Sequence, residues 1–382
     1  MITKKILLAG INMILLSVLI HNSSLLAQDR RPGFNYDESN VPKYELPALL
    51  ISNNGQKITS KEMWEDIRRD EVLKHFKDNV YGNFPEGSYK VNYKLIKQID
   101  SALDGKSIYK EVLITFSRKR KKQEAVLSIF LPKGGKKAAP LFISLNVSGN
   151  QAVHSDPYIS ITDKWITTKD YAPDNVATEK SRGVRTYPIE LLLERGYGFA
   201  TVYSGDFFPD KKNGYAESIQ SLFYKKSQQE ALDYEWGCLA TWSWGLSRCM
   251  DYFETDDDID HQKVAVIGHS RRGKAALWAG ATDERFALTI SNNSGCGGAA
   301  ISRREFGETV KRIDDNFPHW FCENFGGFKN EITNMPVDQH MLIALMAPRP
   351  VYVASGKLDE WADPKGEFLG ALNASPVYNL FG

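Results

Sequence analysis

The chain contains the stretch Val264-Ala-Val-Ile-Gly-His-Ser-Arg-Arg-Gly-Lys-Ala-Ala-Leu-Trp-Ala-Gly280. Its β-branched start predicts a short strand, Gly268 to Ser270 a sharp turn, and the Ala- and Leu-rich remainder a helix that begins near Arg272. A hydroxyl at such a turn stands at a helix N-terminus, where unpaired backbone N–H groups stabilise a developing oxyanion. The stretch therefore predicts a nucleophile elbow with Ser270 as the nucleophile.

This elbow departs from the usual G-x-S-x-G spacing. Arg272 stands where the second glycine is expected, and the glycine follows at position 273. Gly and Ser are common turn residues, so the G-x-S match alone also fits a structural turn between a strand and a helix. The order strand, turn, helix favours the catalytic interpretation.

The segment Gly268-His-Ser-Arg-Arg-Gly-Lys274 resembles the G-x-S-R-x-G-K elbow of the glucuronoyl esterases, which form carbohydrate esterase family 15. Further segments resemble the bacterial members of this family, in the same order along the chain: residues 242–252, 258–260, 292–298, 317–321, 336–340 and 361–367. The resemblance implies an α/β-hydrolase fold, a three-layer sandwich around a mostly parallel sheet.

Strands that alternate with helices independently predict an α/β fold with a mostly parallel sheet. The expected strands are 89–96, 108–116, 125–131, 141–145, 198–203, 264–268, 286–291 and 350–354, and the main expected helices are 60–76, 189–194 and 228–254. No internal repeat or break in composition divides them. We therefore expect residues 28–382 to form a single domain.

Composition and the N-terminus indicate an exported protein. With 42% hydrophobic residues, 25% charged residues and a net charge of +1, nothing favours nucleic acid or an anionic membrane as a partner. Residues 1–27 begin with a positively charged segment, continue with an apolar run too short to span a bilayer and end in residues typical of a cleavage site. This order predicts a cleaved signal peptide. We expect a secreted or periplasmic protein without a membrane anchor, and the oligomeric state stays open.

Four cysteines remain in the predicted mature chain. Cys238 and Cys249 lie on one predicted helix and are too far apart for a bridge within it. Cys296 and Cys322 lie in loop-like segments and form the candidate disulfide, while four buried thiols are the open alternative. No cysteine or histidine spacing indicates a metal site.

A serine nucleophile needs a base and a carboxylate that orients the base, and in α/β-hydrolases the acid and then the histidine follow the serine. Glucuronoyl esterases often carry Glu after strand 286–291, where this chain has Asn293. The resemblance places the acid at Asp359, in the loop after strand 350–354. Asp363 is the alternative acid, and its other role is to cap the turn before Pro364.

No histidine follows Asp359. The seven histidines are His21, His75, His154, His261, His269, His319 and His340. The resemblance implies a catalytic histidine beyond a further strand, and we expect that this sequence lacks the C-terminal strand and helix, since a sheet that ends on an uncovered strand exposes apolar surface and an unpaired edge. A structural or cleft-lining role is expected for His319, and a packed or surface position for His340.

The resemblance also assigns residues around the serine. Arg271 would hold the oxyanion through its backbone N–H and its guanidinium group. Lys274, Glu308 and Trp361 would hold the sugar. The alternatives are surface charge for Arg271 and Lys274, an ion pair with a neighbouring arginine for Glu308, and core packing for Trp361.

The function implied by the resemblance is that of a carboxylic ester hydrolase. It would cleave esters of (4-O-methyl-)glucuronic acid that link xylan to lignin alcohols, through an acyl-enzyme on Ser270 and without a metal or organic cofactor. Glucuronoxylan or a lignin–carbohydrate ester would be the partner. The alternatives are another carbohydrate esterase that acts on acetylated xylan, and a non-catalytic glucuronoxylan-binding protein that the missing histidine would explain.

Overall fold

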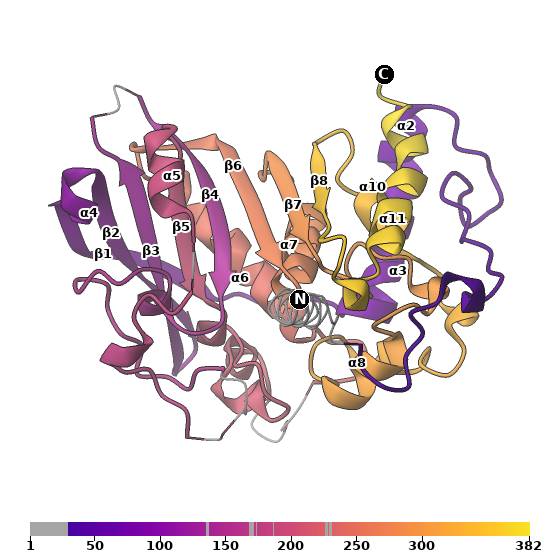
Figure 1. The fold of residues 1–382 in the computed structure, drawn as a ribbon, viewed down its shortest axis with the longest axis horizontal. Helices are drawn as coiled ribbons and strands as arrows, with labels where there is room; N and C mark the ends of the chain where they lie inside the picture. Colours follow the sequence, from indigo (N-terminus) through magenta and orange to yellow (C-terminus); the bar gives the residue numbers. More distant parts are fainter. Residues whose placement is uncertain are drawn as a thin grey trace, which may run out of the picture.

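The computed structural model describes residues 30–134, 137–167, 172, 174–185, 187–225, 228 and 231–382. The predicted signal peptide, residues 1–27, lies outside the described residues. Eight strands form one sheet in the order β1-β2-β3-β5-β4-β6-β7-β8, with helices packed against it (Figure 1). Among the described residues, no helix combines the length and the apolar character needed to cross a bilayer.

All eight predicted strands are present, but β1, β3 and β6 each extend four or five residues beyond a predicted end. The strands are β1 (Lys90–Ser101), β2 (Ser107–Arg118), β3 (Lys121–Pro132), β4 (Ala139–Asn146), β5 (Gly198–Tyr203), β6 (Ile259–His269), β7 (Leu288–Asn292) and β8 (Val351–Ala354). The α-helices are α2 (Lys61–Met63), α3 (Arg69–Phe76), α4 (Ala102–Gly105), α5 (Ile189–Glu194), α6 (Cys238–Phe253), α7 (Arg271–Thr282), α8 (Val310–Asn316), α9 (Glu323–Gly326), α10 (Gln339–Ala344) and α11 (Pro364–Tyr378).

The sheet has an antiparallel part and a parallel part. β1, β2 and β3 form a meander, and β3 pairs antiparallel with β5. β4 pairs parallel with β5 and β6, and β6, β7 and β8 continue in parallel. Parallel neighbours need crossover connections, which α6 and α7 provide around β6. The carboxyl ends of β6, β7 and β8 therefore meet at one edge of the sheet, where the predicted site residues lie.

Helices cover both faces of the sheet. Figure 1 shows α5 in front of the strands and α6 and α7 behind them. Tyr109 and Phe199 pack with α5, whereas the neighbouring Val112 and Ala200 belong to the core on the face of α6 and α7. This separation follows from the alternation of side chains along a strand. The result is the three-layer arrangement that the sequence predicts.

The predicted helix 228–254 is too long, because α6 begins only at Cys238. Residues 231–237 are not helical, and Gly237 is the N-cap. The backbone N–H of Cys238 donates to the carbonyl of His319 at 2.8 Å, and a Cβ on Gly237 would lie 2.5 Å from the carbonyl carbon of Phe321. Contacts with the segment around residue 320 therefore fix where this helix starts. Such distant contacts cannot be predicted from the helix propensity of the residues themselves.

The predicted disulfide between Cys296 and Cys322 is wrong. All four cysteines are free thiols and all four are buried. Burial raises the pKa of Cys296 and of Cys322 to about 12, so both thiols stay protonated. The chain uses its cysteines as small apolar side chains, which was the alternative interpretation.

Candidate active site

The turn that carries Ser270 lies between β6 and α7. Ser270 is the N-cap of α7 and has φ 57° and ψ −128°, a conformation that side chains other than glycine rarely adopt. Its backbone N–H donates to the carbonyl of Asn292 at 2.9 Å, and its carbonyl accepts from the N–H of Gly273 at 2.8 Å. The end of β7 and the first turn of α7 together hold the strained backbone in place.

Two glycines make this turn possible. A Cβ on Gly268 would lie 2.1 Å from the carbonyl oxygen of Arg272, and a Cβ on Gly273 would lie 2.9 Å from the carbonyl oxygen of Gly268. The second glycine is needed where the helix backbone crosses the end of the strand. In this chain that crossing falls at position 273, which accounts for the unusual spacing of the elbow.

The side chain of Ser270 is half-buried, and its Oγ has no hydrogen-bond partner among the described residues. Because Ser270 caps α7, the N–H groups of the first helical turn lie next to it, at the positive end of the helix dipole. A substrate carbonyl attacked by Ser270 would develop its negative charge at this helix end.

Arg271 follows Ser270, and its partly exposed side chain is anchored from the protein interior. Its Nη1 lies 2.5 Å from Oδ2 of Asp210, whose side chain is fully buried. The guanidinium carbon lies 4.5 Å from the ring centroid of Trp320 and 5.2 Å from that of Phe317. Sequence reasoning missed Asp210, which lies in the loop after β5 and belongs to no recognisable motif.

Lys274 and Glu308 are brought together. Nζ of Lys274 lies 2.8 Å from Oε2 of Glu308 and 2.7 Å from the carbonyl of Ser294, and the two charged side chains are only 2% and 9% exposed. Lys274 is therefore not a surface charge. Glu308 does not pair with a neighbouring arginine either, because Arg303 binds Asp338 and Arg304 binds Asp363.

Trp361 joins the same group of residues. Its carbonyl accepts from the N–H of Glu308 at 3.0 Å. Its ring is half-buried, lies edge-on to Phe34 at 4.9 Å, and is covered by the guanidinium of Arg31 at 4.1 Å. The residues before β1 thus border the predicted sugar-binding residues, which the sequence did not indicate.

Asp359 is half-buried and held by Asn293. Its Oδ2 accepts a hydrogen bond of 2.6 Å from Nδ2 of Asn293, while Oδ1 of Asn293 accepts from the N–H of Gly356 at 2.9 Å. Asn293 therefore links the end of β7 to both ends of the loop that carries Asp359. A cavity of about 360 Å³, lined in part by Arg31 and Trp361, opens beside Asp359.

Asp363, the alternative acid, has a different role. It is the N-cap of α11, accepts from the N–H of Gly366 at 3.0 Å and binds Arg304 at 2.8 Å. Its side chain is 3% exposed, and burial raises its pKa. Asp363 is the helix cap that the sequence offered as its other role, and it is not open to the site.

His319 and His340, which lie in segments that resemble the family, form hydrogen bonds away from Ser270. Nε2 of His319 lies 3.0 Å from Oδ1 of Asp210, and Nε2 of His340 lies 3.1 Å from the carbonyl of Pro47. Neither is hydrogen-bonded to Ser270 or Asp359 in the part of the chain that the structure describes. These contacts agree with the structural role expected for His319 and with the packed position expected for His340.

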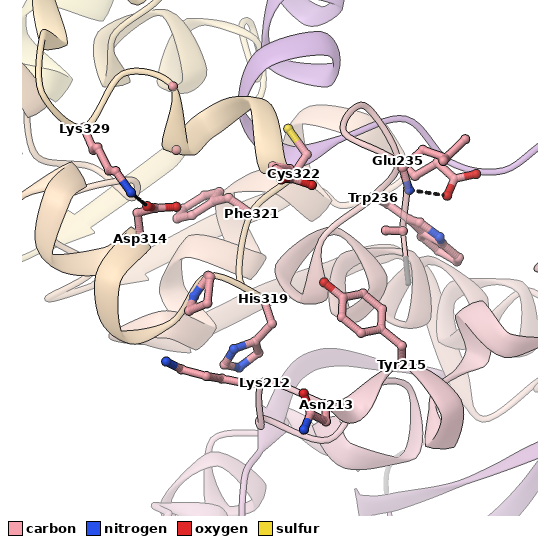
Figure 2. A pocket seen from close by; sticks show the side chains of 16 residues that line it. Lys212, Asn213, Tyr215, Glu235, Trp236, Asp314, His319, Phe321, Cys322 and Lys329 are labelled. Carbon is pink, nitrogen blue, oxygen red and sulfur yellow. Dashed lines mark hydrogen bonds and ion pairs between the residues drawn. The ribbon is translucent and has the colours of Figure 1, made fainter. Parts of the chain in front are cut away.

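His319 also lines a cavity. This cavity measures about 580 Å³ and is bordered by Lys212, Tyr215 and the segment from Pro318 to Lys329. Figure 2 shows Lys329 paired with Asp314 along one side of it. The side chain of His319 is the link between this cavity and the buried carboxylate of Asp210.

The chain is similar to known proteins of one family. The family model described as glucuronyl esterase, fungi, matches residues 210–382. A 4-O-methyl-glucuronoyl methylesterase of Wolfiporia cocos is 36% identical over 369 residues, which cover 92% of this chain and 74% of that protein. The chain belongs to the glucuronoyl esterases of carbohydrate esterase family 15. The predicted family and fold are therefore confirmed.

Solved structures of this family resemble the chain along most of its length. A promiscuous family 15 esterase from a marine bacterial metagenome has 50% identity and a TM-score of 0.85, and the match covers 92% of this chain and 88% of that chain. The glucuronoyl esterase from Solibacter usitatus has 45% identity and a TM-score of 0.85, with 91% and 88% covered. This chain is accordingly a carboxylic ester hydrolase of the glucuronoyl esterase type.

Proposed function

We propose that Ser270 is the nucleophile of this glucuronoyl esterase and attacks the carbonyl carbon of a glucuronate ester. The observation that best supports this proposal is the strained backbone of Ser270, which has φ 57° at the start of α7 and is followed by Arg271, whose guanidinium is anchored by Asp210. Attack forms a bond from Oγ to the carbonyl carbon, and the alcohol leaves with a proton. Water then releases glucuronate from the acyl-enzyme.

Arg271 and the first turn of α7 stabilise the oxyanion of the tetrahedral intermediate. The backbone N–H at the helix start and the permanent charge of Arg271 both favour a negative oxygen at this end of the helix. Removing one such donor from an acyl-transfer enzyme typically lowers kcat by about 10²–10³-fold.

Asp359 has the role of the orienting carboxylate. Its loop follows β8, where α/β-hydrolases can place the triad acid, and Asn293 fixes the direction of the carboxylate. An orienting carboxylate acts through a histidine, and all seven histidines of the printed sequence precede Asp359. We assign the base to none of these seven.

Lys274, Glu308 and Trp361 form the sugar-binding group. The buried ion pair would supply an ammonium and a carboxylate to sugar hydroxyls. Trp361, whose ring is covered by the guanidinium of Arg31, borders the cavity beside Asp359 and would contact the sugar there. The substrate class is the ester between (4-O-methyl-)glucuronate on xylan and a lignin alcohol. The methylesterase of Wolfiporia cocos carries the same uronate in its name, and the predicted signal peptide agrees with a secreted or periplasmic enzyme.

The test measures turnover of benzyl glucuronate and of acetylated xylan by the wild-type protein and by Ser270→Ala. We expect hydrolysis of benzyl glucuronate and its loss in the variant. A matched control is Ser101→Ala at the exposed end of β1, which should keep wild-type kinetics. Faster release of acetate than of benzyl alcohol would favour the acetyl-xylan alternative, which the promiscuity named for the marine relative makes relevant.

Binding without turnover would favour the non-catalytic alternative. Wild-type kinetics in Ser270→Ala would exclude the proposed mechanism. The intact mass of the assayed protein is measured alongside, so that each result refers to a chain of known length.

A further inference from the structure

The loop after β5 carries Asp210, a buried carboxylate that forms an ion pair with Arg271, the residue after the proposed nucleophile. Asp210 lies 61 positions before Arg271 in the sequence, and its Oδ2 lies 2.5 Å from Nη1 of Arg271. The side chain of Asp210 is 0% exposed, whereas that of Arg271 is 23% exposed. One end of the ion pair is therefore in the protein interior and the other end reaches the site.

The other oxygen of Asp210 is held by aromatic donors. Oδ1 accepts a hydrogen bond of 2.8 Å from Nε1 of Trp320, and it lies 3.0 Å from Nε2 of His319. Both oxygens are engaged, so the carboxylate cannot rotate without losing a partner. A buried carboxylate of this kind is fixed in position as well as in charge.

Asp210 is ionised at neutral pH. Burial alone would raise its pKa, but the positive charge of Arg271 and the hydrogen bonds from His319 and Trp320 outweigh this effect and hold the pKa at about 2. The anchor for Arg271 is thus a permanent negative charge.

The aromatic rings that hold Asp210 also support Arg271. Phe317 and Trp320 are stacked with their centroids 4.0 Å apart and their planes 6° apart, and the guanidinium of Arg271 lies over both. Trp320 therefore donates to the carboxylate with its Nε1 and carries the cation on its face. The guanidinium is located by an ion pair along one edge and by π-contacts on one face.

From this geometry we infer that Asp210 is a positioning residue for catalysis, which holds the guanidinium of Arg271 at the place where the oxyanion forms. The inference rests on the proposed role of Arg271 in the oxyanion site. The side chain of Asp210 is fully buried, and its partners are Arg271, His319 and Trp320. It acts by removing the freedom of a long side chain before the reaction begins, so that no reorganisation is needed when charge develops.

The test is a double-mutant cycle of Asp210→Asn and Arg271→Ala, with kcat and KM for benzyl glucuronate as readouts. Asparagine keeps the shape of the side chain and removes its charge. We expect Asp210→Asn to lower kcat by about 10- to 100-fold, less than the complete loss of an oxyanion donor because Arg271 is still present, with KM within about twofold. In the Arg271→Ala background the same substitution should change kcat by less than about twofold, because residues that act as one unit are not additive.

Rescue by guanidinium ion separates positioning from a structural role. Added guanidinium chloride at low, non-denaturing concentration should restore part of the kcat of Arg271→Ala, since the ion can bind Asp210 and the rings in place of the side chain. It should restore nothing in the double variant. Equal rescue in both would overturn the inference.

A matched control is Asp256→Asn. Asp256 is a buried carboxylate that pairs with Lys110 at 2.7 Å and precedes β6, at the end of that strand opposite Ser270. It should lose stability without losing kcat. If Asp210→Asn does not fold, Trp320→Phe is the alternative test, because it removes only the Nε1 donor and keeps a ring under Arg271. This variant should lower kcat and leave KM unchanged. Wild-type kcat would count against the inference.

The outcomes distinguish the inference from the proposed function. Wild-type kcat in Arg271→Ala would remove the oxyanion role of Arg271, whatever Asp210 does. A large loss in Arg271→Ala together with wild-type kcat in folded Asp210→Asn would keep that role and overturn the positioning role of Asp210.

Discussion

Nδ2 of Asn293 donates a hydrogen bond of 2.6 Å to Oδ2 of Asp359. The family resemblance implies Glu at this position, so this chain has a neutral donor where a second carboxylate was expected. Asn293 adopts φ 44°, a left-handed conformation that Asn and Asp tolerate better than other residues with a side chain. Asn is therefore suited to this position, because it tolerates the left-handed backbone and its amide binds the carboxylate of Asp359.

The first prediction concerns Asn293→Asp, which would place two carboxylates within hydrogen-bond distance. Like charges at this distance resist ionising together, so one of them keeps its proton to higher pH. We expect the acid limb of the kcat/KM profile for benzyl glucuronate to move up by at least about one pH unit. The control is Asn293→Ala, which removes the donor without adding charge; it should lower activity and leave the acid limb of the profile at its wild-type pH. An acid limb that does not move in Asn293→Asp would count against Asp359 as the orienting acid.

A second prediction concerns the buried pair of Lys274 and Glu308. Lys274→Met leaves the carboxylate of Glu308 buried without its cation, which should cost about 3–5 kcal/mol of unfolding free energy in urea at pH 7. The double variant Lys274→Met/Glu308→Gln should lose clearly less than the sum of the two single losses, because no unpaired charge remains.

The control for this pair is Lys311→Met, which breaks an exposed ion pair with Asp315 on α8 and should cost less than about 1 kcal/mol. Additive losses in the double variant would show that the two side chains do not act as a pair in solution.

The strained backbone of Ser270 gives a third prediction. Ser270→Ala and Ser270→Gly both remove the hydroxyl, so both should abolish esterase activity. Glycine relieves a strain of about 1–3 kcal/mol but adds freedom to the unfolded chain worth roughly 0.5–1 kcal/mol, so Ser270→Gly should be about 1 kcal/mol more stable than Ser270→Ala. Urea unfolding measures the difference, and an alanine variant as stable as the glycine variant would show that the elbow is not strained.

The fourth prediction uses the depressed pKa of Asp210. The folded pKa is about 2 against an ordinary value of 3.8, so this carboxylate stabilises the fold fully above about pH 5 and loses that contribution as pH falls toward 2. Wild-type protein should therefore lose its stability advantage over Asp210→Asn as the solution is acidified. We expect the gap to shrink by roughly 1.5 kcal/mol between pH 5 and pH 2.5. A gap that stays constant would show that Asp210 is not ionised and paired in the folded protein.

The parts of the fold and site with local signals could be predicted from the sequence. The elbow is contiguous, and its strand, turn and helix each follow from neighbouring residues, so Ser270 at the start of α7 could be located before any coordinates. The helix α5 and the strand β5 have the bounds that periodicity predicts. These elements need no distant partner to be recognised.

What the sequence could not provide depends on distant contacts. Asp210 contacts residues 61 and 110 positions away, and no spacing in the sequence links the loop after β5 to the segment around Trp320. The predicted helix 228–254 failed for the same reason, since the residue at which α6 starts is set by the carbonyls of His319 and Trp320. The disulfide prediction was wrong because it paired two cysteines on the expectation of an oxidising compartment, and the sequence did not show that all four are buried.

The central claim is that Ser270 is the nucleophile, and covalent labelling tests it most directly. The protein is incubated with a serine-directed fluorophosphonate, which loses fluoride as it forms a bond to an activated hydroxyl, and the adduct is mapped by peptide mass spectrometry while residual hydrolysis of benzyl glucuronate is measured. The account predicts one adduct, on the peptide that contains Ser270, with activity lost in proportion to labelling. Turnover that continues with Ser270 fully labelled, or inhibition by an adduct at another residue, would contradict it.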